Sequence, residues 1–235
     1  RSVILSASVF LDGKYVGNDN GVIIEVYGTL TGTSVNITGG DLGDTIVLTN
    51  VTSTTTIDGG AGNNTIYIGS NATLTGNTGG TADLIAAQLT LTSSYGGFDN
   101  VIIDETNNID SKVIEFTDDV TGHYITGLSP ARIYYEKIED LNINLASKAN
   151  SVNFRSVEPL SNIDLTTGTT GNDTIYMGSD STSTLNEILG HVTVDTRAGN
   201  DTLRLNDSGD TADNTGVNAG VLTSTTITGL GTGGI

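Results

Sequence analysis

The sequence contains no cysteine and no tryptophan, and its 235 residues include one methionine and two prolines. Without cysteine, the chain cannot be a disulfide-stapled scaffold, a zinc ribbon or a thiol catalyst. Basic residues are also scarce, since Lys and Arg total 9 against 27 Asp and Glu, giving a formal charge of -18. Contacts with phosphates need Lys and Arg, so we expect no nucleic-acid partner. No apolar run approaches the length of about 18 residues that a membrane helix needs, so we predict no membrane span.

Glycine, in contrast, is abundant, with 31 residues. Hydrophobic residues make up 36% of the chain and charged residues only 15%, a balance that argues against disorder. The apolar residues are mostly Ile, Val and Leu, in short runs between Gly, Asn, Asp and Thr. This pattern predicts many short strands joined by tight turns. Two short segments, 82–88 and 185–189, are candidates for helices.

The alternation of β-branched residues predicts a series of very short strands. Strands of this length are not stable as isolated hairpins, but a stack of coils gives each strand a neighbour above and below. The predicted strands are 22–26, 35–37, 45–48, 65–68, 89–91, 101–103, 113–116, 141–145, 163–165, 192–194, 203–205 and 225–227.

Five segments share a motif in which turn residues, ending in an acidic or amide residue, precede an apolar-x-apolar triplet. The segments are 39–48, 59–68, 96–103, 168–177 and 197–205. The first two are offset by 20 residues, from Thr45 to Thr65, which is about one coil of a β-solenoid. The sequence therefore predicts an all-β fold, a parallel β-solenoid (β-helix or β-roll) with coils of about 20 residues.

The sequence also contains a second repeat with a longer period. Residues 65–70 recur as 174–179, and residues 125–128 recur as 227–230. These repeats divide one continuous solenoid into N-terminal coils (1–53), a first block (54–128), bridging coils (129–162) and a second block (163–235). The chain begins at Arg1 rather than at a methionine, and we expect it to be a segment of a longer protein.

The motifs resemble a known family. Residues 39–47 read Gly-Gly-Asp-Leu-Gly-Asp-Thr-Ile-Val, and residues 59–67 read Gly-Gly-Ala-Gly-Asn-Asn-Thr-Ile-Tyr. Both are similar to Gly-Gly-x-Gly-x-Asp-x-apolar-x, the repeat of RTX (haemolysin-type) calcium-binding proteins, as are the Asn-Asp-Thr segments at 172–175 and 200–203. The resemblance implies Ca²⁺ held between stacked turns by carboxylates and turn carbonyls. Here the motifs are isolated rather than tandem, and Asn64 replaces the usual Asp.

The chemistry of these residues also suits calcium. Glycine permits a positive φ that directs carbonyls inward, and Asp adds a hard oxygen ligand of the kind Ca²⁺ prefers. The alternative is a set of plain turns, because Asn-Asp and Gly-Asn favour left-handed corners without a metal. The candidate calcium ligands are Asp41, Asp44, Asn64, Asp99, Asp173 and Asp201.

Repetition without a catalytic constellation favours a structural protein over an enzyme. We expect a calcium-stabilised solenoid segment of a large repetitive extracellular or cell-surface protein, such as an adhesin, S-layer or self-assembling fibre. Its partners would be further copies stacked end to end, or tandem modules of one long chain, with a cell-surface glycan as a further candidate.

Two alternatives remain open. One is a β-helix enzyme acting on acidic polysaccharide, and the other is a carbohydrate- or ice-binding module. Acidic pairs at 104–105 and 118–119 are of the kind that glycosidases use. The densest group of basic residues is Arg132, Lys137, Lys148 and Arg155.

Overall fold

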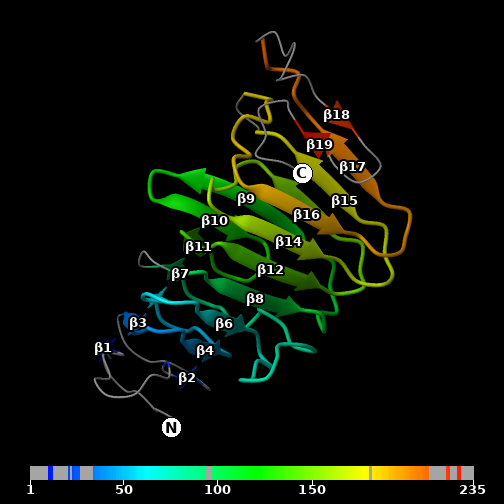
Figure 1. Cartoon of the computed structure of the whole chain (residues 1–235). Coiled ribbons are helices and arrows are strands. Elements are labelled where there is room, and N and C mark those ends of the chain that lie inside the picture. The colour runs from blue at the N-terminus through cyan, green and yellow to red at the C-terminus, as the bar shows by residue number, and fades with distance from the viewer. Residues whose placement is uncertain are drawn as a thin grey trace.

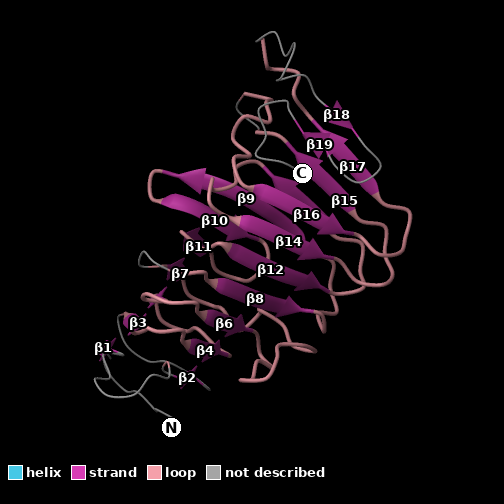
Figure 2. Cartoon of the chain, in the orientation of Figure 1, coloured by secondary structure: helices cyan, strands magenta, loops and turns pink. Residues whose placement is uncertain are grey.

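The computed structural model describes residues 10–12, 21, 23–26, 34–93, 97–179, 182–211, 221–222 and 227–228. Within these residues the chain forms strands, turns and loops and contains no helix, which confirms the predicted all-β class (Figure 2). Almost all the strands belong to two sheets, and the strands of each follow one another along the length of the molecule (Figure 1).

The larger sheet has ten strands and is parallel except around β10, which pairs antiparallel with both β9 and β11. Its order is β1 (Phe10–Asp12), β3 (Val35–Thr38), β5 (Thr55–Asp58), β7 (Leu89–Thr92), β11 (Ile133–Glu136), β10 (Gly122–Thr126), β9 (Val113–Asp119), β13 (Ser151–Phe154), β15 (Thr174–Met177) and β17 (Thr202–Leu205).

The smaller sheet has seven strands, and every pairing in it is parallel. Its order is β16 (His191–Asp195), β14 (Asn162–Thr166), β12 (Asp140–Leu145), β8 (Asn100–Glu105), β6 (Thr65–Ile68), β4 (Thr45–Leu48) and β2 (Ile23–Val26). A separate antiparallel pair joins β18 (Val221–Leu222) and β19 (Ile227–Thr228).

Successive strands alternate between the two sheets. From β2 to β8 the even-numbered strands lie in the seven-stranded sheet and the odd-numbered strands in the ten-stranded sheet, and the alternation resumes from β12 to β17. A parallel pair needs a connection that returns the chain to its starting edge, and here the other sheet provides it. The segment β9–β10–β11 interrupts the pattern, because all three strands remain in the ten-stranded sheet.

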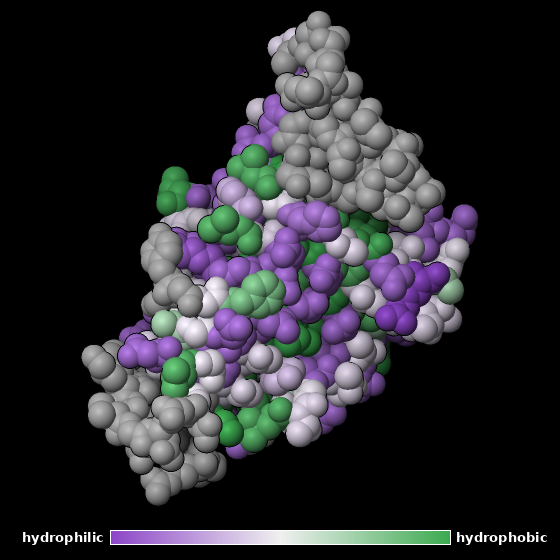
Figure 3. All heavy atoms as spheres, viewed as in Figure 1, coloured by the Kyte–Doolittle hydropathy of each residue, from purple (hydrophilic) through white to green (hydrophobic). Residues whose placement is uncertain are grey.

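The core is one cluster of buried apolar side chains from both sheets. Alternation produces it: in β12 every second residue is buried, and Leu141 lies between Val101 and Ile163 on the neighbouring strands. Phe116 and Phe154 stack with their ring centroids 4.6 Å apart. The outer surface seen in Figure 3 mixes hydrophilic residues with smaller hydrophobic patches.

The two segments with helical candidates, 82–88 and 185–189, are turns. Ile85 and Ile188 are fully buried, and each forms an isolated parallel bridge, with Val51 and Val157 respectively. Packing into the core therefore overrides local helix propensity. The predicted strand at 225–227 lies outside the described residues except for Ile227.

Several strands were not in the predicted set, among them β5, β10, β11 and β13. The repeated Thr-Ile-Tyr segments also occupy different sheets, since Thr65–Ile68 forms β6 and Thr174–Met177 forms β15. The repeat at 65–70 and 174–179 is therefore local, and its two copies do not occupy equivalent places in one sheet.

Candidate functional site

Buried polar side chains in the seven-stranded sheet link successive strands through their backbones. The N–H of Asp44 donates a hydrogen bond to Oδ1 of Asn64 at 2.8 Å, and the N–H of Asn64 donates to Oδ1 of Asp99 at 3.1 Å. The N–H of Asp99 donates in turn to Oε2 of Glu139 at 2.8 Å. These residues lie directly before β4, β6, β8 and β12. We call Asp44, Asn64, Asp99 and Glu139 the first ladder.

The same contact recurs in the ten-stranded sheet. The N–H of Lys112 donates to Oδ1 of Asn150 at 3.1 Å, and the N–H of Asn150 donates to Oδ1 of Asp173 at 2.8 Å. The N–H of Asp173 donates to Oδ1 of Asp201 at 2.9 Å. These residues directly precede β9, β13, β15 and β17, and we call them the second ladder. In both ladders each N–H donates to the residue that comes later in the chain.

The ladders provide partners for backbone groups in the interior. Asn64, Asp99, Asn150 and Asp173 are at most 2% exposed. A buried N–H without a partner costs about 1–3 kcal/mol, so the side-chain acceptors remove a substantial penalty. Neighbouring strands lie about 4.8 Å apart, and the short Asp or Asn side chain places an oxygen across that distance. Stacking of the strands is thus enough to explain the polar residue before each strand.

The glycines of the motifs also have a packing role. A Cβ built on Gly39 would lie 2.0 Å from the carbonyl oxygen of Gly59, and one on Gly97 would lie 1.6 Å from the carbonyl oxygen of Gly62. Both distances are far below any van der Waals contact. The turns of successive strands therefore approach so closely that only glycine fits.

The structure separates the six candidate calcium ligands into three places. Asp44, Asn64 and Asp99 lie in the first ladder, whereas Asp173 and Asp201 lie in the second ladder, in the other sheet. The sixth candidate, Asp41, is exposed in the turn before β4 and belongs to neither ladder.

Three ladder residues were not among the predicted site residues, namely Lys112, Glu139 and Asn150. The signal that would have found Glu139 and Asn150 is their position, directly before an alternating apolar strand. Lys112 carries no such signal, because it contributes only its backbone N–H.

Several ladder oxygens accept hydrogen bonds from protein donors, whereas Oδ2 of Asp173 is buried and accepts none from the described residues. Oδ1 of Asp99 accepts from both the N–H and the Nδ2 of Asn64, and Oδ2 of Asp44 accepts from the N–H of Gly40. Among the described residues, no group of three or more His, Asp or Glu side chains is arranged to hold a metal ion. Ca²⁺ takes about six to eight oxygens, and the described part of either ladder does not bring such a set of acidic side chains together. Calcium binding by this chain stays a prediction from the motifs.

Burial shifts the acid–base equilibrium of the first ladder. It raises the pKa of Asp99 above its ordinary value, and hydrogen bonds with Ser93 and Asn64 oppose this shift. The negative charge of Glu139 adds a smaller increase. The Asp99 carboxylate is thus held in an environment that favours its protonated form.

A second buried carboxyl, Glu105, lies beside the only cation that reaches it among the described residues. Its Oε1 is 3.4 Å from Nζ of Lys112 and accepts a hydrogen bond from the N–H of Ala82. Lys112 also pairs with Asp83 at 2.8 Å. Burial raises the pKa of Glu105, and the positive charge of Lys112 opposes the increase.

The acidic pairs considered for catalysis have structural partners. Asp104 is fully buried and accepts hydrogen bonds from the N–H of Gly80 and from Thr106, while Glu105 is held as described above. Asp119 lies at the end of β9 and accepts hydrogen bonds from Thr121, which lower its pKa.

Three residues of the predicted basic group lie beside acidic side chains. Arg132 is 3.3 Å from Asp119, and Lys137 is 3.5 Å from Glu136. Arg155 forms an ion pair with Glu115.

In comparisons with known proteins, no family model matches the chain, and no curated protein or solved structure shows significant similarity to it. The resemblance to RTX proteins therefore rests on the short motifs alone. Within the described part of the chain, no helix has the length and apolar character needed to cross a membrane.

Proposed function

We propose that this chain is a structural module, a parallel β-solenoid segment of a large repetitive protein at the cell surface or outside the cell. Outside β9–β11, successive strands alternate between two largely parallel sheets, which supports this proposal because each pair of strands then makes up one coil. The shared core supports it as well, since the side chains of both sheets form one cluster along the stack.

The observation that carries the proposal is the pair of side-chain ladders. Each ladder repeats one contact across four successive strands of its sheet. The residues joined by it are separated by 20, 35 and 40 positions in the first ladder and by 38, 23 and 28 in the second. The contact is the same in every step, although the loops between the strands differ in length. The residues that join one coil to the next are therefore kept, while the loops vary.

Each ladder contact is a hydrogen bond between protein groups, so we propose that the coils are stable without calcium. The test is thermal unfolding followed by circular dichroism, on protein stripped of metal and then supplied with Ca²⁺ or with a chelator. We expect the same Tm in both conditions. A marked increase in Tm with Ca²⁺, absent with Mg²⁺, would support the calcium prediction from the RTX-like motifs and contradict metal-free stability.

We further propose that modules of this kind stack end to end, whether as separate chains or as tandem parts of one chain. At the C-terminal end of the stack, β16 and β17 are the last strands of their sheets. Leu203 and Leu205 of β17 are 52% and 38% exposed, so this strand offers apolar side chains as well as a free edge within the described residues. Electron microscopy and sedimentation at increasing concentration test the proposal: filaments or linear oligomers would support it, and monomers at every concentration would contradict it.

A further inference from the structure

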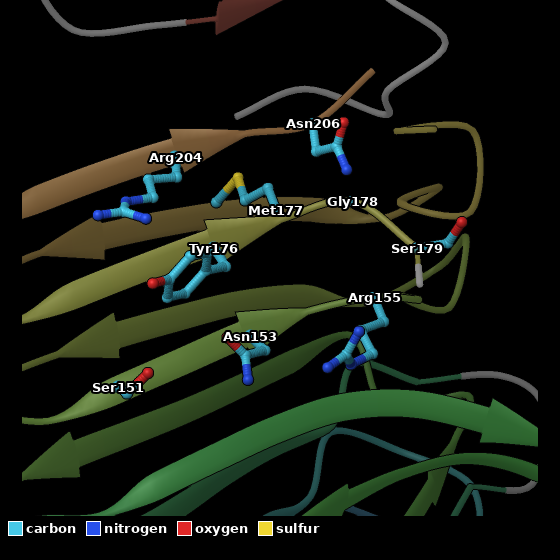
Figure 4. A pocket seen from close by; sticks show the side chains of 9 residues that line it. All are labelled: Ser151, Asn153, Arg155, Tyr176, Met177, Gly178, Ser179, Arg204 and Asn206. Carbon is cyan, nitrogen blue, oxygen red and sulfur yellow. The ribbon is translucent and has the colours of Figure 1, made fainter. Parts of the chain in front are cut away.

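The outer surface of the ten-stranded sheet is hollowed where β13, β15 and β17 lie side by side (Figure 4). The hollow has a volume of about 360 Å³. Ligand sites typically occupy concave regions of about this size with a few polar groups directed inward. The residues that carry the argument are Asn153, Arg155, Tyr176, Gly178, Arg204 and Asn206.

A glycine, Gly178, lies in the middle of one row of residues that line the hollow. The register pairs Phe154 with Met177 and Met177 with Leu205, so the next residues, Arg155, Gly178 and Asn206, form the following row. Gly178 has a φ of +133°, and a Cβ there would lie 2.5 Å from the carbonyl oxygen of Asn206. A side chain at Gly178 would therefore clash with the neighbouring strand, so only glycine permits this close approach to Asn206.

The hollow carries basic side chains, although the chain has a formal charge of -18. Two of the nine basic residues, Arg155 and Arg204, line the hollow. Arg155 is neutralised by its ion pair with Glu115. Arg204 lies with its guanidinium 5.3 Å from the centre of the Tyr176 ring and forms no ion pair with any residue that the structure describes. Among the described residues that line the hollow, Arg204 is therefore the cation available to a ligand anion.

The other groups are of the kinds that bind sugars. Arg204 lies over the ring of Tyr176, but Tyr176 is 37% exposed, so the part of the ring that Arg204 leaves uncovered offers an aromatic surface against which a sugar ring can pack. In Figure 4 the side chains of Asn153 and Tyr176 extend from neighbouring strands on this surface, and Asn206 lies at the opposite end of the row from Arg155. Amide side chains both donate and accept hydrogen bonds, as sugar hydroxyls require. Arg204 supplies the planar, paired donors that fit a carboxylate.

We propose that this hollow binds the carboxylate-bearing sugar unit of a glycan, a uronic acid in its simplest form. The carboxylate contacts Arg204, the sugar ring packs on Tyr176, and the hydroxyls contact Asn153 and Asn206. The overall charge of -18 repels long polyanions, so a single acidic unit in an otherwise neutral glycan fits better than a polyuronate. This binding is independent of the structural role proposed above.

The test is a titration of the ¹⁵N-labelled chain with glucuronate, followed by NMR chemical shifts, with glucose and acetate as parallel probes. We expect millimolar glucuronate to shift the amide signals of β13, β15 and β17, and glucose and acetate to bind at least tenfold more weakly. No shift at these strands with glucuronate would overturn the proposal. Equal shifts with acetate would also overturn it, because the hollow would then bind anions without recognising a sugar.

Matched variants locate the site. Arg204→Gln is expected to weaken glucuronate binding by roughly tenfold or more. Arg197→Gln removes the same charge at an exposed residue outside the hollow and is expected to leave binding unchanged. Equal weakening by both variants would overturn the proposal, because it would show a general charge effect. Tyr176→Ser, read in the same titration, tests the stacking contact without a change of charge, and unchanged affinity would contradict the assigned pose.

Discussion

The backbone N–H of Asp173 donates a 2.9 Å hydrogen bond to Oδ1 of Asp201, although the two residues are 28 positions apart. The intervening chain leaves β15, visits β16 in the other sheet and returns to β17. The same contact joins Asn150 to Asp173 across only 23 positions. The register of the sheet, rather than a fixed spacing in the sequence, therefore determines which residues meet.

The second ladder can be tested at Asp173, whose Oδ1 accepts the N–H of Asn150. Asp173→Ala removes that acceptor and leaves a buried N–H without a partner, so we expect a loss of about 1–3 kcal/mol in the free energy of unfolding. Asp173→Asn keeps an oxygen in the same place, and we expect it to retain most of the stability. Denaturant unfolding at constant pH measures both variants.

Asp41 is the matched control for that experiment. It belongs to the same motif class but is exposed and accepts no hydrogen bond from a described residue. We expect Asp41→Ala to change the free energy of unfolding by less than about 0.5 kcal/mol. If Asp41→Ala destabilised the chain as much as Asp173→Ala, and only in the presence of Ca²⁺, a metal-ligand role would be favoured over the ladder.

Close approach of the turns predicts that Gly39 tolerates no side chain. A Cβ at this position would lie 2.0 Å from the carbonyl oxygen of Gly59, so we expect Gly39→Ala to cost at least about 1–3 kcal/mol. The control is Gly76→Ala, because no atom lies within 4 Å of its Cβ position. Thermal unfolding distinguishes the two, and equal Tm values would contradict the close stacking of the turns.

The stacked pair of Phe116 and Phe154 in the core predicts a large cost of truncation. Both rings are fully buried, and their centroids are 4.6 Å apart. We expect Phe154→Ala to lower the free energy of unfolding by about 3–5 kcal/mol. Leu160→Ala, at a residue 65% exposed, is expected to change it by less than about 0.5 kcal/mol. If Phe154→Ala lowered the free energy of unfolding as little as Leu160→Ala, the placement of Phe154 in the core would be contradicted.

The buried carboxyls predict how stability varies with pH. The pKa values of Asp99 and Glu105 are raised in the folded chain, so the folded state binds their protons more tightly than the unfolded state does. Stability from these groups is complete below their ordinary pKa values and is lost as pH rises through the raised values. We therefore expect Tm to increase as pH falls from neutral toward about 4, the ordinary range of carboxyl pKa values.

Asp119 contributes in the opposite direction, because its pKa is lowered, but this carboxyl is solvent-exposed and its effect is small.

Glu105→Gln provides the control, since it removes one titrating group and is expected to flatten the change of Tm with pH. A Tm that falls steadily on acidification toward about pH 4 would contradict the assignment.

The sequence predicts the local elements of this fold well and its long-range arrangement less well. Alternating apolar residues such as Leu141 and Ile143 identify most of the strands, because burial on one face follows directly from the pattern. The 20-residue period holds between Asp44 and Asn64 but extends to 40 positions between Asp99 and Glu139. No local signal encodes these loop lengths, because a loop outside the stack can vary freely.

The β9–β10–β11 segment shows a second limit. His123 lies opposite both Asp118 and Tyr135, so β10 is antiparallel to its two neighbours in an otherwise parallel sheet. The two-residue turn at Val120 and Thr121 forms this hairpin, since Asp119 pairs with Gly122, but short turns also connect strands of different sheets. Only pairing with the rest of the sheet distinguishes the two outcomes.

The candidate site, like the fold, can be predicted from the sequence only in part. The 20-residue offset places Asp44 and Asn64 one coil apart, and these two residues are neighbours in the structure. No regular spacing predicts that Asp99, 35 positions after Asn64, is the next residue of the ladder. The partners of these residues are backbone N–H groups, which have no sequence signature. For that reason the same pattern is consistent with a calcium site and with a hydrogen-bonded ladder until the geometry is known.

Amide hydrogen exchange measured by NMR, in the presence of a chelator, tests the ladders most directly. We predict that the N–H groups of Asn64, Asn150 and Asp173 exchange as slowly as the amides within the neighbouring strands, and that Asp173→Ala accelerates exchange at Asn150. Fast exchange at these three amides in metal-free protein, with protection only after Ca²⁺ is added, would contradict a stack stabilised by its own side chains.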